Sequence, residues 1–397
     1  MATILVTWEL GLAMGHVGTV RPLIDHLIDQ GHRVVAALKD VTQAANLSKN
    51  SAVQCLQAPV RLNAVRAPFQ APSTFAHILH NAGFSAVDEL RPMVNAWRAL
   101  YDLVRPELIL FQHSPTAILA SQACDVHRLS IGTGFCCPPN REPLPDWRPY
   151  LKNNPEQLRR DEQHVRSVAN EMLTAWNKQP LDRLSDLYQR DMETILSTFP
   201  ELDHFGVRSG GNYWGVWSAG FGRPPVWPAA PGRRVFAYLK PFRALEALLD
   251  CLVRRRTPTV IYGPTIDRQV QERFQCDTLR FMADPVELGA AGQQCDLAIL
   301  NATHGTTAAM LLAGKPSLHI PLFLEQQLSA DNVVKMGAGL SAEANNAPRV
   351  VSQLETLLDN TACYEPAAAA FASRYASFDY RGQVDRLAAH VEHLLGA

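Results

Sequence analysis

Short runs of consecutive apolar residues alternate along this chain with longer segments in which apolar residues recur at helical spacing. The first run covers residues 3–8 and is followed by a glycine-containing loop, a helical pattern over residues 20–30, and a second apolar run at residues 33–38. Such runs predict strands that are buried on both faces, and a helix between two of them is the crossover that parallel strands need. The chain therefore opens with a predicted βαβ unit.

The same alternation continues, and it restarts after a segment rich in Gly, Pro and Trp at residues 210–231, which we interpret as a linker. Before the linker, strands are expected at residues 108–111 and 128–131, a helix at 116–123, a loop at 138–149, and two or three helices within 156–196. After it, strands are expected at residues 235–239, 259–262, 279–282, 297–300 and 317–320, and helices at 243–254, 306–313, 329–336, 350–358, 367–376 and 383–395.

This pattern predicts an α/β protein built from two Rossmann-like domains. A chain of 397 residues is long for a single hydrophobic core, and both halves show the same alternation of strand and helix. We place the N-terminal domain at residues 1–218 and the C-terminal domain at residues 219–376. Two such domains facing across a cleft would present the carboxyl ends of both sheets, where ligands bind in this architecture.

Composition narrows the classes of function. Apolar residues make up 47% of the chain, charged residues 19%, and the formal net charge is −1, which indicates a globular protein and argues against a nucleic-acid binder. No apolar stretch approaches the roughly 20 residues of a transmembrane helix, and the first residues lack the basic leader of a secretory signal. The eight cysteines are scattered without a C-x-x-C pair, which favours reduced thiols in a cytoplasmic protein.

The loop after the apolar run at residues 297–300 is a candidate anion site. Residues 301–305 read Asn-Ala-Thr-His-Gly and lead into a helix that we expect Thr306 and Thr307 to open. Gly305 lets the backbone come close to a ligand, and the free N–H groups and dipole of a helix start favour an anion such as a diphosphate. The alternative is that Thr306 simply caps the helix.

The segment that follows carries several matches to a known signature at fixed spacing. The register runs without gaps from Thr306 through Gly314, Pro316, Pro321, Glu325 and Gln326 to Ala330. This arrangement resembles the donor site of the large family of nucleotide-sugar glycosyltransferases with the GT-B fold, which includes plant and antibiotic enzymes. The resemblance covers nearly the whole chain. It implies that a last helix, at residues 377–397, crosses back onto the N-terminal domain.

The resemblance also implies roles for individual residues of the donor site. The diphosphate would be held by the loop and the helix start, at Asn301, Thr303, His304, Gly305, Thr306 and Thr307. Glu325 and Gln326 would hydrogen-bond hydroxyls of the donor sugar, and Phe281 and Met282 would flank the base. The alternative for Glu325 and Gln326 is an exposed polar turn.

Two departures from the family pattern bear on the donor. A histidine of the family falls on Asn301, and a glutamate that contacts ribose hydroxyls falls on Ala309. His304, three residues after Asn301, would then take over the phosphate contact. The loss of the glutamate leaves room for a deoxyribose nucleotide such as dTDP beside UDP.

The loop after the first apolar run carries a G-H-V sequence around His16, which resembles the acceptor-side loop of the same family. In many relatives this histidine is the general base, because an acceptor hydroxyl is a poor nucleophile until a base accepts its proton. His16 is thus the candidate base, and the alternative is that it only shapes the loop. Where relatives place an aspartate partner, this chain has Gln112; Glu9 is the candidate substitute acid and His113 the second candidate base.

The resemblance implies a glycosyltransferase that moves a hexosyl or deoxyhexosyl group from a UDP- or dTDP-sugar to an acceptor hydroxyl with inversion. No D-x-D motif follows a predicted strand and no zinc-ligand spacing occurs, so neither a metal nor a cofactor is expected beside the donor. The expected partners are the nucleotide sugar and an acceptor that no motif identifies. Two other hypotheses are a sugar-nucleotide epimerase of the same fold and a binding protein without catalysis, which Gln112 and Ala309 keep open.

Overall fold

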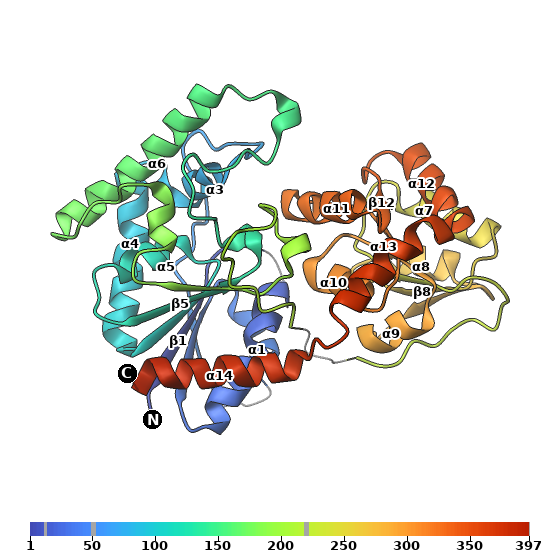
Figure 1. The fold of residues 1–397 in the computed structure, drawn as a ribbon, viewed down its shortest axis with the longest axis horizontal. Helices are drawn as coiled ribbons and strands as arrows, with labels where there is room; N and C mark the ends of the chain where they lie inside the picture. The colour runs from blue at the N-terminus through green and yellow to red at the C-terminus, as the bar shows by residue number, and fades with distance from the viewer. Residues whose placement is uncertain (12–13, 49–52, 218–221, 397) are drawn as a thin grey trace. The chain divides into compact units, whose positions relative to one another are not determined.

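The computed structural model describes residues 1–11, 14–48, 53–217 and 222–396. The chain forms two compact units (Figure 1). The N-terminal unit comprises Met1–Pro200, Phe205–Trp217 and Asp379–Ala397, and the C-terminal unit comprises Glu201–His204 and Ser218–Phe378. Each unit is a six-stranded parallel sheet with flanking helices, so the prediction of two Rossmann-like halves is confirmed.

The sheet of the N-terminal unit has the strand order β3-β2-β1-β4-β5-β6. Its strands are β1 (Thr3–Trp8), β2 (Arg33–Leu38), β3 (Gln54–Gln57), β4 (Leu108–Gln112), β5 (His127–Gly132) and β6 (Glu193–Leu196). Its helices are α1 (Met14–Asp29), α2 (Ala44–Leu47), α3 (Phe75–Leu79), α4 (Val87–Val104), α5 (Pro115–Ser121), α6 (Pro155–Ala175) and α14 (Tyr380–Gly396). β1 and β4 are buried along almost their whole length, as their apolar runs predict.

The prediction for residues 156–196 was wrong in part. This segment forms one long helix, α6, a short 3₁₀ turn at Leu184–Tyr188, and then the strand β6. β6 is the last strand of its sheet and pairs with β5; its last residue, Leu196, also forms an isolated bridge with Tyr213, and its last two residues are buried. A four-residue edge strand has a weak apolar pattern of its own and depends on pairing with the adjacent strand. The sequence pattern therefore did not predict β6.

The sheet of the C-terminal unit has the order β12-β11-β10-β7-β8-β9. Its strands are β7 (Val235–Tyr238), β8 (Thr259–Tyr262), β9 (Leu279–Met282), β10 (Leu297–Leu300), β11 (Ser317–His319) and β12 (Gly339–Ser341). Its helices are α7 (Leu245–Arg254), α8 (Arg268–Phe274), α9 (Leu288–Gln294), α10 (His304–Leu312), α11 (Leu324–Met336), α12 (Ala347–Asp359) and α13 (Thr361–Arg374). Alternate strand residues enter two apolar clusters, with Ala237 and Ile299 in one and Phe236 and Ala298 in the other.

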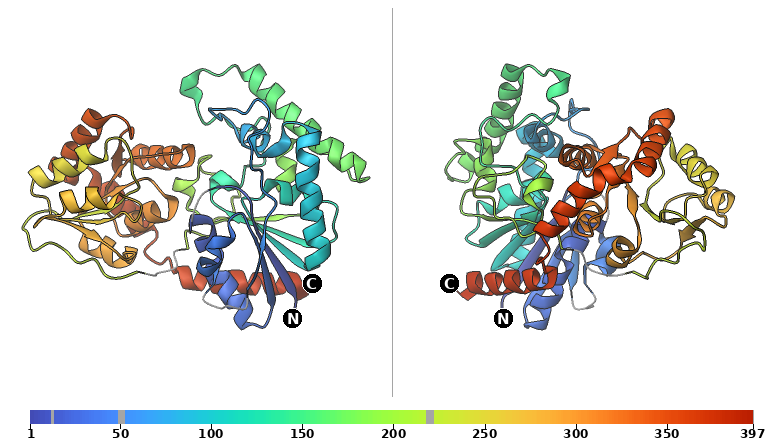
Figure 2. Two further views of the ribbon diagram at one scale, coloured as in Figure 1. Left: turned by 180° about the vertical axis from the view of Figure 1, so that it is seen from behind. Right: turned by 45° about the vertical axis from the view of Figure 1, so that its right-hand side comes forward.

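The last helix, α14, belongs to the N-terminal unit and runs beside α1 (Figures 1 and 2). One ion pair joins His26 of α1 to Asp385 of α14, at 3.5 Å between Nδ1 and Oδ1. A second contact joins His32 Nε2 to Glu392 Oε1 at 2.6 Å. The buried face of α14 is apolar, so this helix is held mainly by packing.

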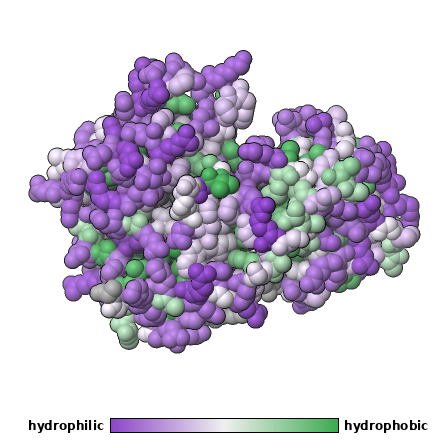
Figure 3. All heavy atoms as spheres, viewed as in Figure 1, coloured by the Kyte–Doolittle hydropathy of each residue, from purple (hydrophilic) through white to green (hydrophobic). Residues whose placement is uncertain are grey.

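Polar residues cover most of the face shown in Figure 3, and apolar patches on each unit are smaller. Within the described ranges, no helix is both long enough and apolar enough to span a membrane.

A buried carboxylate joins the end of β1 to the start of α5. Glu9 directly follows β1 and is 3% exposed. Its two carboxylate oxygens accept hydrogen bonds from the backbone N–H of Thr116, at 3.0 Å, and from the Thr116 hydroxyl, at 2.8 Å. Burial raises the pKa of Glu9 from 4.5 to about 7, although the hydrogen bonds from Thr116 oppose this shift.

This contact predicts a pH dependence of stability. Because the pKa of Glu9 is raised in the folded state, its contribution is fully present below pH 4.5 and is lost as the pH rises through about 7. The isosteric Glu9→Gln variant should lose this pH dependence. Between pH 4.5 and about 7, the unfolding free energy of wild type should therefore fall relative to that of the variant, by up to roughly 3 kcal/mol.

Urea unfolding followed by circular dichroism at acidic and mildly alkaline pH measures this difference. Glu107→Gln is the matched control, because Glu107 is exposed in the described structure. Parallel pH profiles for wild type and Glu9→Gln would contradict the assignment of a raised pKa to Glu9.

Candidate functional site

The strand order of the C-terminal sheet reverses between β10 and β7, so the chain leaves these neighbouring strands toward opposite sides. In open α/β sheets, ligands bind at such a point, outside the carboxyl ends of the strands. Here the two loops at that point are residues 301–303 after β10 and residues 239–244 after β7. The predicted diphosphate loop is therefore located where this architecture places ligands.

Asn301 fixes the geometry of this point. Its Oδ1 accepts a hydrogen bond from the backbone N–H of Lys240 at 2.6 Å, and its Nδ2 donates to the carbonyl of Ile320 at 2.8 Å. The side chain is buried, with 2% exposure. Asn301 thus ties the end of β10 to the loops after β7 and β11, and both ends of its amide group are engaged within the protein.

The helix after this loop begins earlier than predicted. Thr303 is the N-cap with extended backbone angles, and α10 starts at His304, so His304 and Gly305 belong to the first turn and the expectation of a start at Thr306 was wrong. The cap is recognisable from the hydrogen bond between Thr307 N–H and the Thr303 carbonyl, at 2.9 Å. The Thr303 hydroxyl donates to the Thr306 hydroxyl at 3.1 Å.

The first turn of α10 is open to a ligand. A Cβ atom added at Gly305 would meet no heavy atom within 4 Å. The first N–H groups of a helix have no partner within the helix, and together they carry about half a positive charge. The space beside Gly305 and the N–H groups of this turn would together suit an anion.

Two side chains of α10 have polar atoms that are shielded from water and lack a hydrogen-bond partner among the described residues. They are the hydroxyl of Thr307 and both ring nitrogens of His304. Burial lowers the pKa of His304 to about 4, with Asp203 opposing the shift, so the ring is neutral near pH 7. Buried polar groups are costly when they make no hydrogen bond, and a bound polar ligand is one way to supply the partner.

A segment far from the predicted motifs forms part of this site. Asp203 and His204 belong to the C-terminal unit, and the ring of His204 lies 5.4 Å from that of His304. His204 Nε2 is 3.1 Å from the hydroxyl of Ser329, and Asn332 Nδ2 donates to the Asp203 carbonyl at 3.1 Å. No motif marks this segment in the sequence.

The predicted sugar-binding pair lies at the start of α11. Gln326 is 7% exposed, and its Oε1 accepts a hydrogen bond from the backbone N–H of Leu322 at 2.8 Å, so it holds its own turn in place. Glu325 is half-buried in the first turn. The contact of both residues with a donor sugar stays a prediction.

The predicted base-flanking residues end β9, and their side chains enter different clusters. Phe281 packs against one apolar cluster of the unit and Met282 against the other. Met282 pairs in register with Tyr262, and Tyr262 with Tyr238, whose ring lies 5.3 Å away. These two tyrosines were missed by sequence reasoning, because only the strand register brings the ends of β7 and β8 beside Met282.

The N-terminal sheet has its own reversal, between β1 and β4. Trp8 pairs with Gln112, so the sheet brings Glu9, Gln112 and His113 together at one edge. Gln112 is 3% exposed, and its Oε1 has no hydrogen-bond partner among the described residues. The His113 carbonyl accepts from the Leu10 N–H at 3.0 Å.

His16 lies in the first turn of α1, and its side chain is outside the part of the chain that the structure describes. Glu9 is engaged with the start of α5, and this contact gives it a positioning role. The catalytic roles predicted for His16, Glu9, Gln112 and His113 stay predictions.

Aromatic side chains adjoin His113 in the N-terminal unit. The ring of Phe135 lies edge-on to His113 at 6.0 Å and stacks on Trp147 at 5.0 Å. Phe205 lies 4.8 Å from Trp147. The Trp147 indole N–H has no hydrogen-bond partner in the described structure. At this edge of the sheet, His113 therefore lies beside an aromatic wall formed by Phe135, Trp147 and Phe205.

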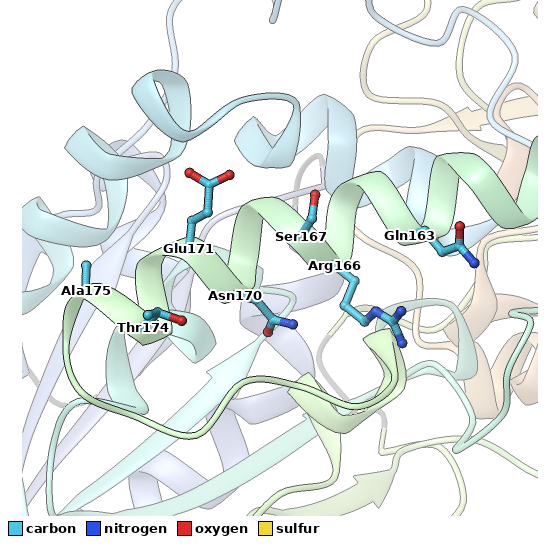
Figure 4. A pocket seen from close by; sticks show the side chains of 7 residues that line it. All are labelled: Gln163, Arg166, Ser167, Asn170, Glu171, Thr174 and Ala175. Carbon is cyan, nitrogen blue, oxygen red and sulfur yellow. The ribbon is translucent and has the colours of Figure 1, made fainter.

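An open groove of about 600 Å³ runs along α6, and its lining side chains all come from that helix (Figure 4). Arg166 donates to the carbonyl of Asp182, and Asn170 exchanges hydrogen bonds of 2.6 and 3.0 Å with the backbone of Leu181. None of the lining residues follows a strand. We assign this groove no part in the reaction.

The described residues include no group of three or more His, Cys, Asp or Glu side chains placed to hold a metal ion.

No family model matches the chain, and no curated sequence matches it. Solved structures match it over nearly its whole length. The glycotransferase of kitacinnamycin is 16% identical over 99% of both chains, with a TM-score of 0.69. VinC, a glycosyltransferase solved in complex with dTDP, is 16% identical over 98% of this chain and 100% of its own, with a TM-score of 0.64. The spinosyn rhamnosyltransferase SpnG, solved with spinosyn aglycone, is 15% identical over 98% and 100%, with a TM-score of 0.67. The chain therefore has the GT-B fold of these glycosyltransferases.

Proposed function

We propose that this protein transfers a sugar from a nucleoside diphosphate sugar to an acceptor hydroxyl, with inversion at the anomeric carbon and without a metal ion. The observation that carries the proposal is the start of α10, which lies at the strand-order reversal and is open at Gly305. Its buried polar groups at His304 and Thr307 have no partner among the described residues. The dTDP complex of VinC and the aglycone complex of SpnG support a donor and an acceptor of these kinds.

The start of α10 would hold the diphosphate and stabilise it as it leaves. Backbone N–H groups of His304, Gly305 and Thr306 belong to the first turn, where the helix dipole favours negative charge. Charge develops on the diphosphate as its bond to the anomeric carbon breaks, so donors fixed in place beforehand lower the barrier. UDP- and dTDP-sugars are the candidate donors, and the absence of a carboxylate at Ala309 leaves room for the deoxyribose of dTDP.

The N-terminal unit would hold the acceptor. The acceptor oxygen attacks the anomeric carbon, the bond between that carbon and the diphosphate oxygen breaks, and the acceptor proton passes to His16. His113 is the alternative base, because it lies at the edge of the sheet with Gln112. The aromatic wall of Phe135 and Trp147 beside His113 suits an apolar or aromatic acceptor.

We also propose that the protein works in a reducing compartment, the cytoplasm. All eight of its cysteines are free thiols, and four of the eight are partly or fully exposed. Thiols persist in this state where glutathione keeps them reduced.

Thr306 tests the donor site. Thr306→Asp places a carboxylate in the first turn of α10, where it suits the helix dipole but repels a diphosphate. Thr306→Asn is the control, because asparagine has the size of aspartate and no charge. A nucleotide at about 100 times its dissociation constant should raise stability by roughly 2.7 kcal/mol. We expect UDP or dTDP to stabilise wild type and Thr306→Asn, and to have little effect on Thr306→Asp.

Thermal shift with UDP, dTDP, GDP and ADP is the measurement, and Ser352→Asp on the exposed side of α12 controls for added charge elsewhere. If no nucleotide stabilises a folded wild-type protein, the donor-site proposal is wrong.

His16 tests the chemistry. Removal of a general base slows a reaction by typically 10²–10⁴-fold. The His16→Ala variant should therefore lose transfer to this extent while it retains its affinity for the nucleotide. Assays of sugar release and transfer on a panel of hydroxylated acceptors measure the rate, and titration calorimetry measures the affinity.

Conversion of the donor sugar by wild type without any acceptor would instead indicate an epimerase. Binding of the donor with no turnover by wild type would indicate a binding protein.

A further inference from the structure

The start of α10 needs positive charge that its own side chains do not supply. A diphosphate carries at least two negative charges, and a helix start contributes only about half a positive charge. Asn301 is neutral and engaged with its neighbours, and burial keeps the ring of His304 neutral by lowering its pKa to about 4. The hydroxyls of Thr306 and Thr307 are neutral as well.

A basic residue lies in the loop after β7, which is next to the loop that leads into this helix. Lys240 stands two residues after the end of β7, in the loop at the strand-order reversal. Its backbone N–H donates to the side chain of Asn301 at 2.6 Å, which ties its backbone to the loop that leads into α10. Lys240 therefore occupies the loop facing the predicted diphosphate loop across the reversal.

The ammonium group of Lys240 has no carboxylate partner in the part of the chain that the structure describes, although the residue is half-buried. Most surface arginines of the same unit are paired. Examples are Arg255 with Asp359, Arg256 with Asp277, and Arg273 with Glu246. A half-buried lysine without a carboxylate partner in the described structure is available to bind an anionic ligand.

We propose that Lys240 contacts the diphosphate of the nucleotide donor and neutralises the charge that develops as the diphosphate leaves. This inference deepens the proposed function and rests on it. It also accounts for Asn301 at the position where relatives have a histidine, because the charge comes from the neighbouring loop and Asn301 serves to hold that loop in place. The ligand class that Lys240 recognises is a nucleoside diphosphate, free or sugar-linked.

The test compares Lys240→Met and Lys240→Arg with wild type. Both variants keep the backbone N–H that bonds to Asn301, so the loop anchor remains. Lys315→Met is the matched control, because Lys315 is also half-buried and without a carboxylate partner in the described structure, but it precedes β11 at the opposite, amino end of the strands. Titration calorimetry gives the dissociation constants for UDP and dTDP and for UMP and dTMP, at low and at high salt.

We expect Lys240→Met to weaken binding of the diphosphate by about 10- to 100-fold, as for loss of a charge-assisted hydrogen bond. The loss for the monophosphate should be smaller, and the salt dependence of diphosphate binding should decrease. Lys240→Arg should recover much of the affinity, and Lys315→Met should match wild type.

Equal diphosphate affinity and equal salt dependence in wild type and Lys240→Met would overturn this inference and leave the proposed function standing. An equal loss for monophosphate and diphosphate with a lowered melting temperature would also overturn it, because that result indicates a structural role. Failure of the wild-type protein to bind any nucleotide would overturn the proposed function and this inference together.

Discussion

The side chain of Asn301 joins the carboxyl ends of three neighbouring strands in the C-terminal sheet. It bonds the loop after β7 through Lys240 N–H and the end of β11 through the Ile320 carbonyl, while its own backbone follows β10. A buried amide that lost either contact would leave a backbone group unsatisfied, which costs about 1–3 kcal/mol. The path of the chain into α10, and with it the site, depends on this one side chain.

In each unit, a buried polar side chain lies where the strand order of the sheet reverses. In the N-terminal unit, Glu9 follows β1 and binds the first turn of α5 through Thr116. In both units, a buried polar side chain just after one strand is hydrogen-bonded to the segment that follows a neighbouring strand. The two units differ in whether the helix start remains free to bind a ligand. Glu9 accepts hydrogen bonds from the start of α5, whereas in the described structure the side chain of Asn301 makes no hydrogen bond with the N–H groups at the start of α10.

The strands that the sequence predicted best are buried on both faces. β1, β4, β8 and β10 appear as apolar runs because crossover helices cover both sides of a parallel sheet. The edge strands β3, β6 and β12 were not predicted, since each is short and partly exposed, whereas the edge strand β9 was predicted at residues 279–282. Their existence depends on pairing, which no local pattern records.

The same division applies to the site. The glycine and hydroxyl residues around Thr306 were recognisable because a helix start that accepts an anion requires such residues locally. Asp203, His204 and Lys240 were missed, because their contacts are distant in sequence: the Lys240–Asn301 and His204–Ser329 hydrogen bonds span 61 and 125 residues. Only strand order and tertiary contacts bring them to the helix.

The central claim is that a nucleoside diphosphate binds at the start of α10 beside Lys240. A crystal structure of the protein with UDP or dTDP tests it most directly. We expect phosphate oxygens within hydrogen-bond distance of the first N–H groups of α10, with the Lys240 ammonium in contact with at least one of them. A diphosphate bound elsewhere on the chain, or no nucleotide density at α10, would contradict it.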